Sequence, residues 1–317
     1  MRKKLALAWV SVMLVAMLTG CGKTTDSEQE AYRQYGINCL ENGDYEEAVE
    51  AFQKALDQSV GSVGSMEIDI CLYKAQAQYM AGDVDGAIES YTALVEYNDY
   101  ADAYYLRGNI YFATGQAELA LADYEGAVKA DDDNYELYIS IYNSLNRYGY
   151  TDKGQEYLSK ALSIKGESGI DKMQKGRIYA LQSDNETAIT NLKAAVDEGV
   201  NKANFYLGQV YGQMGDKEAS STYFQAYIDS GEADSYDLCE MGELQMNSGE
   251  YDTAISFFTA AMALENVPNM QKLMKDCIIA YEYAGDFASA RNIMEEYVET
   301  YPNDTTAKDE YTFLMTR

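Results

Sequence analysis

The chain has 317 residues and a net charge of −28, because 52 Asp and Glu stand against 24 Lys and Arg. This excess of acid argues against nucleic acid as a partner, since phosphate recognition needs clustered basic side chains. The absence of histidine excludes His-based catalytic triads and His–zinc sites, while 47% apolar residues are enough for a hydrophobic core.

The first twenty residues predict an export signal. Three basic residues at positions 2–4 precede an uncharged, mostly apolar stretch that runs from Leu5 to Leu18. At 1.5 Å per residue this stretch spans roughly 21 Å of helix, which is short of a bilayer core of about 30 Å. We therefore interpret residues 1–20 as a signal peptide rather than as a permanent membrane span.

The signal ends in Leu18-Thr19-Gly20-Cys21, which resembles the lipobox of bacterial lipoproteins. The resemblance implies cleavage just before Cys21 and a diacylglyceryl thioether on its thiol. Two acyl chains anchor a protein stably, whereas one is marginal. Residues 21–28 are then the lipidated cysteine and a short tether, and the protein is exported and held on the extracytoplasmic side of a cell membrane. An uncleaved signal anchor with a chance cysteine is the alternative.

A repeated pattern starts at residue 29. Gly43 is followed five positions later by Ala48 and nine positions later by the aromatic Phe52. A small residue also stands seven positions before most of the glycines in this pattern. Measured between these small positions, the repeats are 32 to 39 residues long. The glycine recurs in five further clear copies, and two weaker copies lie between them: Gly82, Gly115, Gly215, Gly249 and Gly285, with weaker copies at Gly149 and Ser183.

This pattern resembles the tetratricopeptide repeat, and we assign about eight copies to residues 29–304. The resemblance implies an all-α fold, a right-handed superhelical solenoid of helix–turn–helix repeats. Small residues let the two helices of a repeat approach closely, the aromatic residue fills the gap between neighbouring pairs, and the glycine takes a positive φ. Tyr142 departs from the pattern, because it stands where the fourth copy should have a small residue. Residues 305–317 are expected to form a C-terminal capping helix, with Asp304 or Thr305 as its N-cap.

The resemblance also implies where a partner binds. In this family the first helices line the concave face at their second, fifth, ninth and twelfth positions. There, aromatic rings supply contact area at low entropic cost, and amides pair with an extended backbone. A tyrosine-rich helical surface without a ligand is the alternative. The candidate residues on this face combine aromatic and amide side chains: Tyr79, Tyr105, Asn109, Phe112 and Asn143.

Residues 147–177 form the one net-basic stretch, with seven basic and four acidic residues. Within it, Arg177 falls on a concave-face position and is a candidate for receiving a carboxylate from a partner. A solvated stretch with local charge balance is the alternative. Four cysteines follow Cys21 without any CxxC pair, and we interpret them as small buried residues. They are Cys39, Cys71, Cys239 and Cys277.

No nucleophile–base pair, phosphate loop or metal motif occurs in the sequence, so we expect no enzymatic activity, no cofactor and no metal. The sequence instead predicts a membrane-anchored scaffold that binds a protein or peptide partner at the extracytoplasmic face of a bacterial membrane. Its acidity favours cationic partners. An assembly lipoprotein of the envelope or of pili is one alternative, and a capture protein for exported peptides or small ligands is another.

Overall fold

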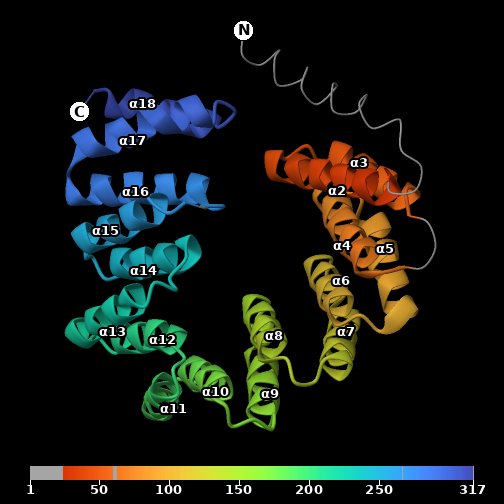
Figure 1. Cartoon of the computed structure of the whole chain (residues 1–317), viewed down its shortest axis with the longest axis horizontal. Coiled ribbons are helices and arrows are strands. Elements are labelled where there is room, and N and C mark those ends of the chain that lie inside the picture. Colours follow the sequence, from red (N-terminus) through yellow and green to blue (C-terminus); the bar gives the residue numbers. More distant parts are fainter. Residues whose placement is uncertain (1–23, 60–62, 266, 317) are drawn as a thin grey trace. The chain divides into compact units, whose positions relative to one another are not determined.

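The computed structural model describes residues 24–59, 63–265 and 267–316, which form seventeen α-helices and no strands (Figure 1). The helices belong to two compact units: unit 1 ends at Ile164 and unit 2 begins at Lys165. The predicted all-α array of helical repeats is therefore confirmed. The predicted signal peptide and the lipidation site at Cys21 lie outside the described residues.

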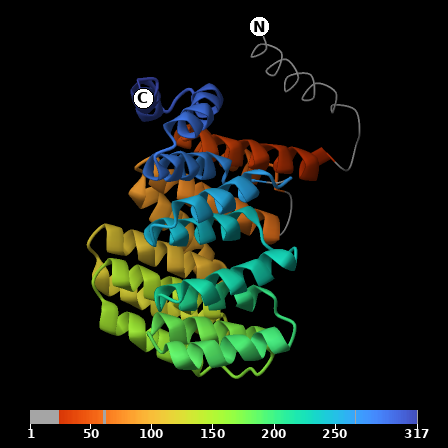
Figure 2. The same cartoon turned by 90° about the vertical axis from the view of Figure 1, so that its left-hand side faces the viewer.

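Unit 1 contains four helix pairs. In each pair a first helix, here called helix A, is joined by a short turn to a second helix, helix B, which runs back beside it (Figures 1 and 2). The helices of unit 1 are α2 (Thr24–Asn42), α3 (Tyr45–Asp57), α4 (Ser65–Met80), α5 (Val84–Asn98), α6 (Ala101–Ala113), α7 (Ala117–Ala130), α8 (Tyr135–Arg147) and α9 (Thr151–Leu162).

Unit 2 contains four more pairs and a terminal helix, α18. Asp304 is the N-cap of α18 and accepts a hydrogen bond from the backbone N–H of Ala307 at 3.2 Å, as one of the two predicted caps requires. The helices of unit 2 are α10 (Gly169–Leu181), α11 (Asn185–Asp197), α12 (Lys202–Gln213), α13 (Lys217–Asp229), α14 (Ser235–Asn247), α15 (Tyr251–Met262), α16 (Met270–Ala284), α17 (Phe287–Thr300) and α18 (Thr305–Leu314).

The turn between helix A and helix B depends on a residue in the left-handed region. Gly82 has a φ of 86°, and a Cβ built there would meet no atom within 4 Å, so conformation rather than space calls for glycine. In the fifth pair this place is taken by Ser183, with a φ of 64°. The remaining pairs use glycine at the same place: Gly43, Gly115, Gly149, Gly215, Gly249 and Gly285.

The small residue of helix A lies beneath the large residue of helix B in the same pair. A Cβ on Gly208 would come within 2.4 Å of the Phe224 ring, so only glycine lets the two helices lie this close. The prediction that small residues permit close approach is therefore confirmed. The large residue packs first on its own pair, however, and reaches the next pair at its tip. The Tyr124 hydroxyl, for example, lies 2.7 Å from Oγ of Ser144 on α8.

The fourth pair reverses this size pattern. Tyr142 occupies the small position of α8, yet it is buried, with 9% of its surface exposed. Its ring lies against Gly154 on α9, where a Cβ would come within 3.0 Å of the Tyr142 ring. Most other pairs have alanine at the position of Gly154. A smaller residue on helix B thus makes room for a larger one on helix A.

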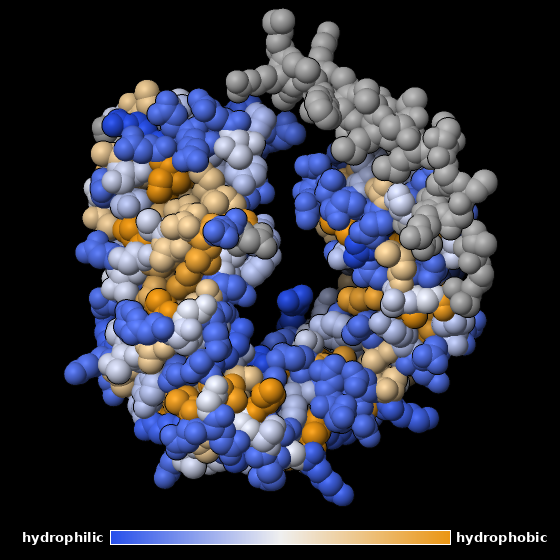
Figure 3. Space-filling model, viewed as in Figure 1, coloured by the Kyte–Doolittle hydropathy of each residue, from blue (hydrophilic) through white to orange (hydrophobic). Residues whose placement is uncertain are grey.

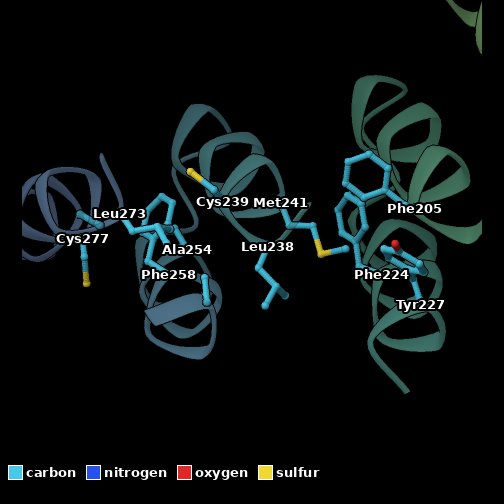
Figure 4. Packing of buried hydrophobic residues seen from close by; sticks show 12 residues of the cluster. Phe205, Phe224, Tyr227, Leu238, Cys239, Met241, Ala254, Phe258, Leu273 and Cys277 are labelled. Atoms are coloured by element: carbon cyan, nitrogen blue, oxygen red, sulfur yellow. The ribbon is translucent and has the colours of Figure 1, made fainter. Parts of the chain in front are cut away.

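The core of unit 2 runs continuously through several pairs. Figure 4 shows Phe205, Phe224 and Tyr227 at one side of this core and Leu273 with Cys277 at the other. Burying an aliphatic or aromatic side chain of this size contributes about 1.5–3 kcal/mol. Because each pair covers the apolar surface of its neighbour, the repeats stabilise one another.

The surface is mainly hydrophilic. In Figure 3 polar residues cover most of the visible face, and apolar residues form patches between them. Within residues 24–59, 63–265 and 267–316, no helix combines the length and the apolar character that crossing a membrane requires.

Candidate functional site

A cleft of about 570 Å³ lies across three consecutive A helices of unit 1: α4, α6 and α8. Ligand pockets typically measure about 300–1,000 Å³. We call this feature the A-helix cleft. Its lining residues are Gln76, Tyr79, Met80, Tyr91, Tyr105, Leu106, Asn109, Ile110, Ala113, Ser140, Asn143, Ser144, Arg147 and Tyr148.

The helical period explains why these residues share one surface. Side chains four positions apart on a helix point to the same side. Gln76 and Met80 on α4 are related in this way, and so are Asn143 and Arg147 on α8. Because the repeats place equivalent positions of successive A helices next to one another, three short stripes combine into one cleft.

The floor of the cleft is a hydrogen-bonded triad. Oδ1 of Asn109 accepts hydrogen bonds from the Tyr124 hydroxyl at 2.6 Å and from the Ser144 hydroxyl at 2.7 Å. Tyr124 is fully buried, and this burial raises the pKa of its phenol far above the usual range, so the hydroxyl stays protonated. The triad fixes the orientation of the Asn109 amide. Its Nδ2 has no partner among the described residues and remains available as a donor.

Aromatic rings form the walls, and two of them, Tyr105 and Tyr148, are held by packing before any ligand enters. The Tyr105 ring stacks on Tyr124 with a centroid distance of 5.9 Å. The Tyr148 ring stacks on Phe112 at 4.9 Å, and 37% of Tyr148 remains exposed. Tyr79 is exposed to 36%. Rings that are already immobilised lose little conformational entropy on binding.

Three polar side chains of the cleft have no partner within the part of the chain that the structure describes. Gln76, Asn143 and Arg147 are all exposed, and none makes a hydrogen bond or ion pair there. Arg147 is also the one Arg, Lys, Asp or Glu among the lining residues. The cleft therefore offers amide donors and acceptors together with a single guanidinium.

The structure brings four of the predicted partner-binding residues together in this cleft: Tyr79, Tyr105, Asn109 and Asn143. Phe112 does not join them. It is exposed to only 6% and packs between the rings of Tyr148 and Tyr150, so it supports the cleft rather than lining it.

Arg177, the remaining candidate, belongs to α10 in unit 2. Its guanidinium lies 4.5 Å from the centre of the Tyr206 ring and donates a hydrogen bond to Oε1 of Gln174 at 2.6 Å. Arg177 is therefore engaged with side chains of its own unit.

Sequence reasoning missed several lining residues, among them Met80, Arg147 and Tyr148. Met80 follows the predicted Tyr79 directly, and Arg147 lies one helical turn beyond the predicted Asn143. Extending the predicted stripe by four residues would have found Arg147. Tyr148 follows the last residue of α8, where a helical period no longer applies.

The cysteines fit their interpretation as buried residues, except that Cys71 is only half-buried. One of them lies in a polar cluster of unit 2. The Cys239 thiol, whose pKa is raised by burial, lies near the carboxylates of Glu243 and Asp276. The Lys272 ammonium sits among them, 3.4 Å from Sγ of Cys239 and 2.6 Å from Oδ2 of Asp276. The chain's own ammonium thus occupies the place that a bound cation would take.

Antiparallel helix pairs that stack one on the next define an α-solenoid. Four segments of the chain match models of the tetratricopeptide repeat: residues 29–59, 72–135, 202–230 and 279–304. The chain therefore contains tetratricopeptide repeats. This fold typically serves as a non-catalytic scaffold for protein interactions.

Solved structures of similar fold include a tetratricopeptide repeat protein from Parabacteroides merdae, with 14% identity, a TM-score of 0.47, and coverage of 80% of this chain and 99% of that one. Cut9–Hcn1 of the APC/C shares 13% identity over 88% of this chain and 54% of that one, with a TM-score of 0.42. TTC0263, a thermophilic repeat protein of Thermus thermophilus, shares 17% identity over 63% and 99%, with a TM-score of 0.35. No curated protein matches the chain.

Proposed function

We propose that the protein is a scaffold that binds an extended peptide segment of a partner protein in the A-helix cleft. The observation that carries this proposal is the cleft itself, in which fixed aromatic rings surround polar side chains that have no partner in the described part of the chain. Exposed groups of this kind are hydrated when the cleft is empty, and a ligand can replace the water.

An extended peptide meets these groups well. Its backbone carries N–H and C=O groups that helices and sheets would otherwise pair, and the amides of Gln76 and Asn143 can each donate and accept. Its side chains can pack on the exposed faces of Tyr79 and Tyr148. Aromatic contacts then supply affinity, and the amides select an extended backbone.

We further propose that a lipid on Cys21 holds this scaffold at the extracytoplasmic face of a bacterial membrane. The basic start, the apolar stretch and the sequence Leu18-Thr19-Gly20-Cys21 support this proposal. Anchoring would raise the local concentration of the cleft for partners at the same surface. Metabolic labelling with a clickable fatty acid tests this. We expect label on the full chain and none on Cys21→Ser, and label on both would contradict lipidation at Cys21.

Peptide selection tests the cleft. We would select a displayed library of random 12-residue peptides on the purified full chain and on two variants. Tyr79→Ala removes an exposed ring of the cleft, whereas Tyr236→Ala removes a ring of unit 2 that is exposed to 57%. Both variants should keep the helicity of the parent.

We expect peptides that are enriched on the parent to bind Tyr236→Ala equally and Tyr79→Ala about tenfold more weakly or worse. Equal binding to both variants would place the binding surface elsewhere. If no peptide is enriched but small aromatic molecules raise the melting temperature, capture of small ligands replaces peptide binding as the function.

A further inference from the structure

Arg147 differs from the other two arginines in the described part of unit 1. Arg107 makes a two-pronged contact with Asp123, with Nε and Nη2 at 2.8 and 2.7 Å from the carboxylate oxygens. Arg33 lies 2.5 Å from Asp69 through its Nε. Arg147 has no ion pair among the described residues, in a chain that carries 52 acidic residues. Among the described residues of unit 1, the guanidinium without an ion pair therefore lies in the cleft.

The surroundings of Arg147 favour an anion. No Asp or Glu lines the A-helix cleft, so a carboxylate that enters it meets no negative charge at close range. The exposed amide of Asn143 lies one helical turn away from Arg147 and can add a neutral donor. A guanidinium fits a carboxylate through two parallel hydrogen bonds, which makes this contact both strong and directional.

The electrostatic field of the whole protein, in contrast to Arg147, disfavours an acidic ligand. With a net charge of −28, the chain repels strongly acidic segments and attracts basic ones at distances up to about a Debye length, ~8–10 Å at physiological salt. A segment that satisfies both influences has few acidic residues in total, but has one at the place that faces Arg147.

We propose that the cleft selects a partner segment in which one internal Asp or Glu pairs with Arg147, within a sequence that is otherwise uncharged or basic. This inference rests on the proposed function, because it specifies the peptide that the cleft binds. Apolar or aromatic residues beside the acidic one pack on the rings of Tyr79 and Tyr105.

Charge reversal provides the test. The displayed 12-residue library is selected on the full chain, on Arg147→Glu and on Lys129→Glu. The control changes the net charge by the same amount, because both substitutions replace a positive side chain by a negative one. Lys129 is a suitable position, since it is also exposed and also lacks an ion pair in the described part of unit 1. Since the displayed peptides are fused through their C-terminus, an enriched acidic residue must act through its side chain.

We expect the parent and Lys129→Glu to enrich peptides with one Asp or Glu at a fixed place, and Arg147→Glu to enrich Lys or Arg there. For a synthetic copy of an enriched peptide, either Arg147→Gln or replacement of the peptide's acidic residue should weaken binding about tenfold or more. Both changes together should add little, because they remove the same contact.

Two failures are distinguishable. If the parent enriches peptides without an acidic preference, or if Arg147→Glu enriches the same motif, the role of Arg147 is overturned while peptide binding stands. If a folded parent enriches no peptide at all, the proposed function fails, and this inference fails with it.

Discussion

The A helices of unit 2 and those that line the A-helix cleft of unit 1 have the same fold, but they differ in whether their exposed polar side chains are paired. In unit 2, polar groups of neighbouring A helices pair with one another: Nε2 of Gln209 donates to Oε1 of Glu240 at 2.6 Å, and Nζ of Lys202 lies 3.0 Å from Oδ1 of Asp237. In unit 1, Asn143 of α8 occupies the position equivalent to Gln209 but has no partner among the described residues. The repeat fixes where these side chains lie, and their neighbours decide whether they remain available.

The difference has an energetic consequence. A ligand that enters a surface with paired groups must first replace internal hydrogen bonds, each of which contributes about 0.5–1.5 kcal/mol. A ligand that enters the A-helix cleft displaces water from Gln76, Asn143 and Arg147. The comparison therefore singles out the cleft as the surface where polar recognition costs least.

The largest expected effect concerns a paired group of unit 2. Asp237 is 6% exposed, and its Oδ2 accepts a hydrogen bond from the Tyr227 hydroxyl at 2.7 Å. Replacing Asp237 by Ala leaves the buried Tyr227 hydroxyl with only the more distant Glu232 carbonyl, at 3.3 Å, and leaves Lys202 without its counter-ion. We expect the unfolding free energy to fall by about 3 kcal/mol.

Urea unfolding followed by circular dichroism measures this loss. Glu240→Ala is the matched control. Glu240 lies on α14, as Asp237 does, but it is exposed, and its side chain pairs with Gln209 of α12. Glu240→Ala should cost less than about 1 kcal/mol. If both variants lost the same unfolding free energy, the burial of the Asp237 contacts would add nothing to their contribution to stability.

A change of pH probes a paired acid of unit 1. Glu67 accepts hydrogen bonds from the Gln29 side chain at 2.9 Å and from the Gly64 backbone at 2.8 Å, which lower the pKa of Glu67 from 4.5 to about 2. A lowered folded-state pKa means that the ionised form stabilises the fold above pH 4.5. This stabilisation is lost as the pH falls from about 4.5 to about 2.

Glu67→Gln isolates this contribution. At pH 6 we expect the variant to melt about 2–4 °C below the parent, and the gap should close as the pH falls through this window. Melting curves at pH 6, 4 and 3 measure the gap. A gap that stays constant over this range would mean that ionisation of Glu67 does not support the contacts of α4 with α2.

The sequence predicts contacts within one helix pair better than contacts between pairs. Turn glycines and small residues recur at fixed spacing, because contacts within one helix pair require them. Four cleft residues could therefore be predicted from their positions. Phe112 could not, since the ring that covers it, Tyr148, belongs to the next pair and follows the end of its helix. Partnership is non-local in the same way: Arg177 meets Tyr206 from the following pair.

The smallest expected effect is the most direct check of the comparison. Arg147 is exposed and has no ion pair in the described part of the chain, so Arg147→Met should change the unfolding free energy by less than about 0.5 kcal/mol. Lys202→Met in unit 2 should cost about 1 kcal/mol, because it leaves the buried Asp237 without its cation. The solvent exposure of Lys202 keeps this cost moderate.

Parallel urea titrations of the two variants decide the matter, since both replace a basic side chain on helix A by methionine. If Arg147→Met were as costly as Lys202→Met, Arg147 would be holding the fold of unit 1 rather than standing ready for a ligand. A neutral Arg147→Met together with a lost acidic preference in peptide selection would separate stability from binding at one residue. That separation is what an open cleft predicts and what a paired surface does not allow.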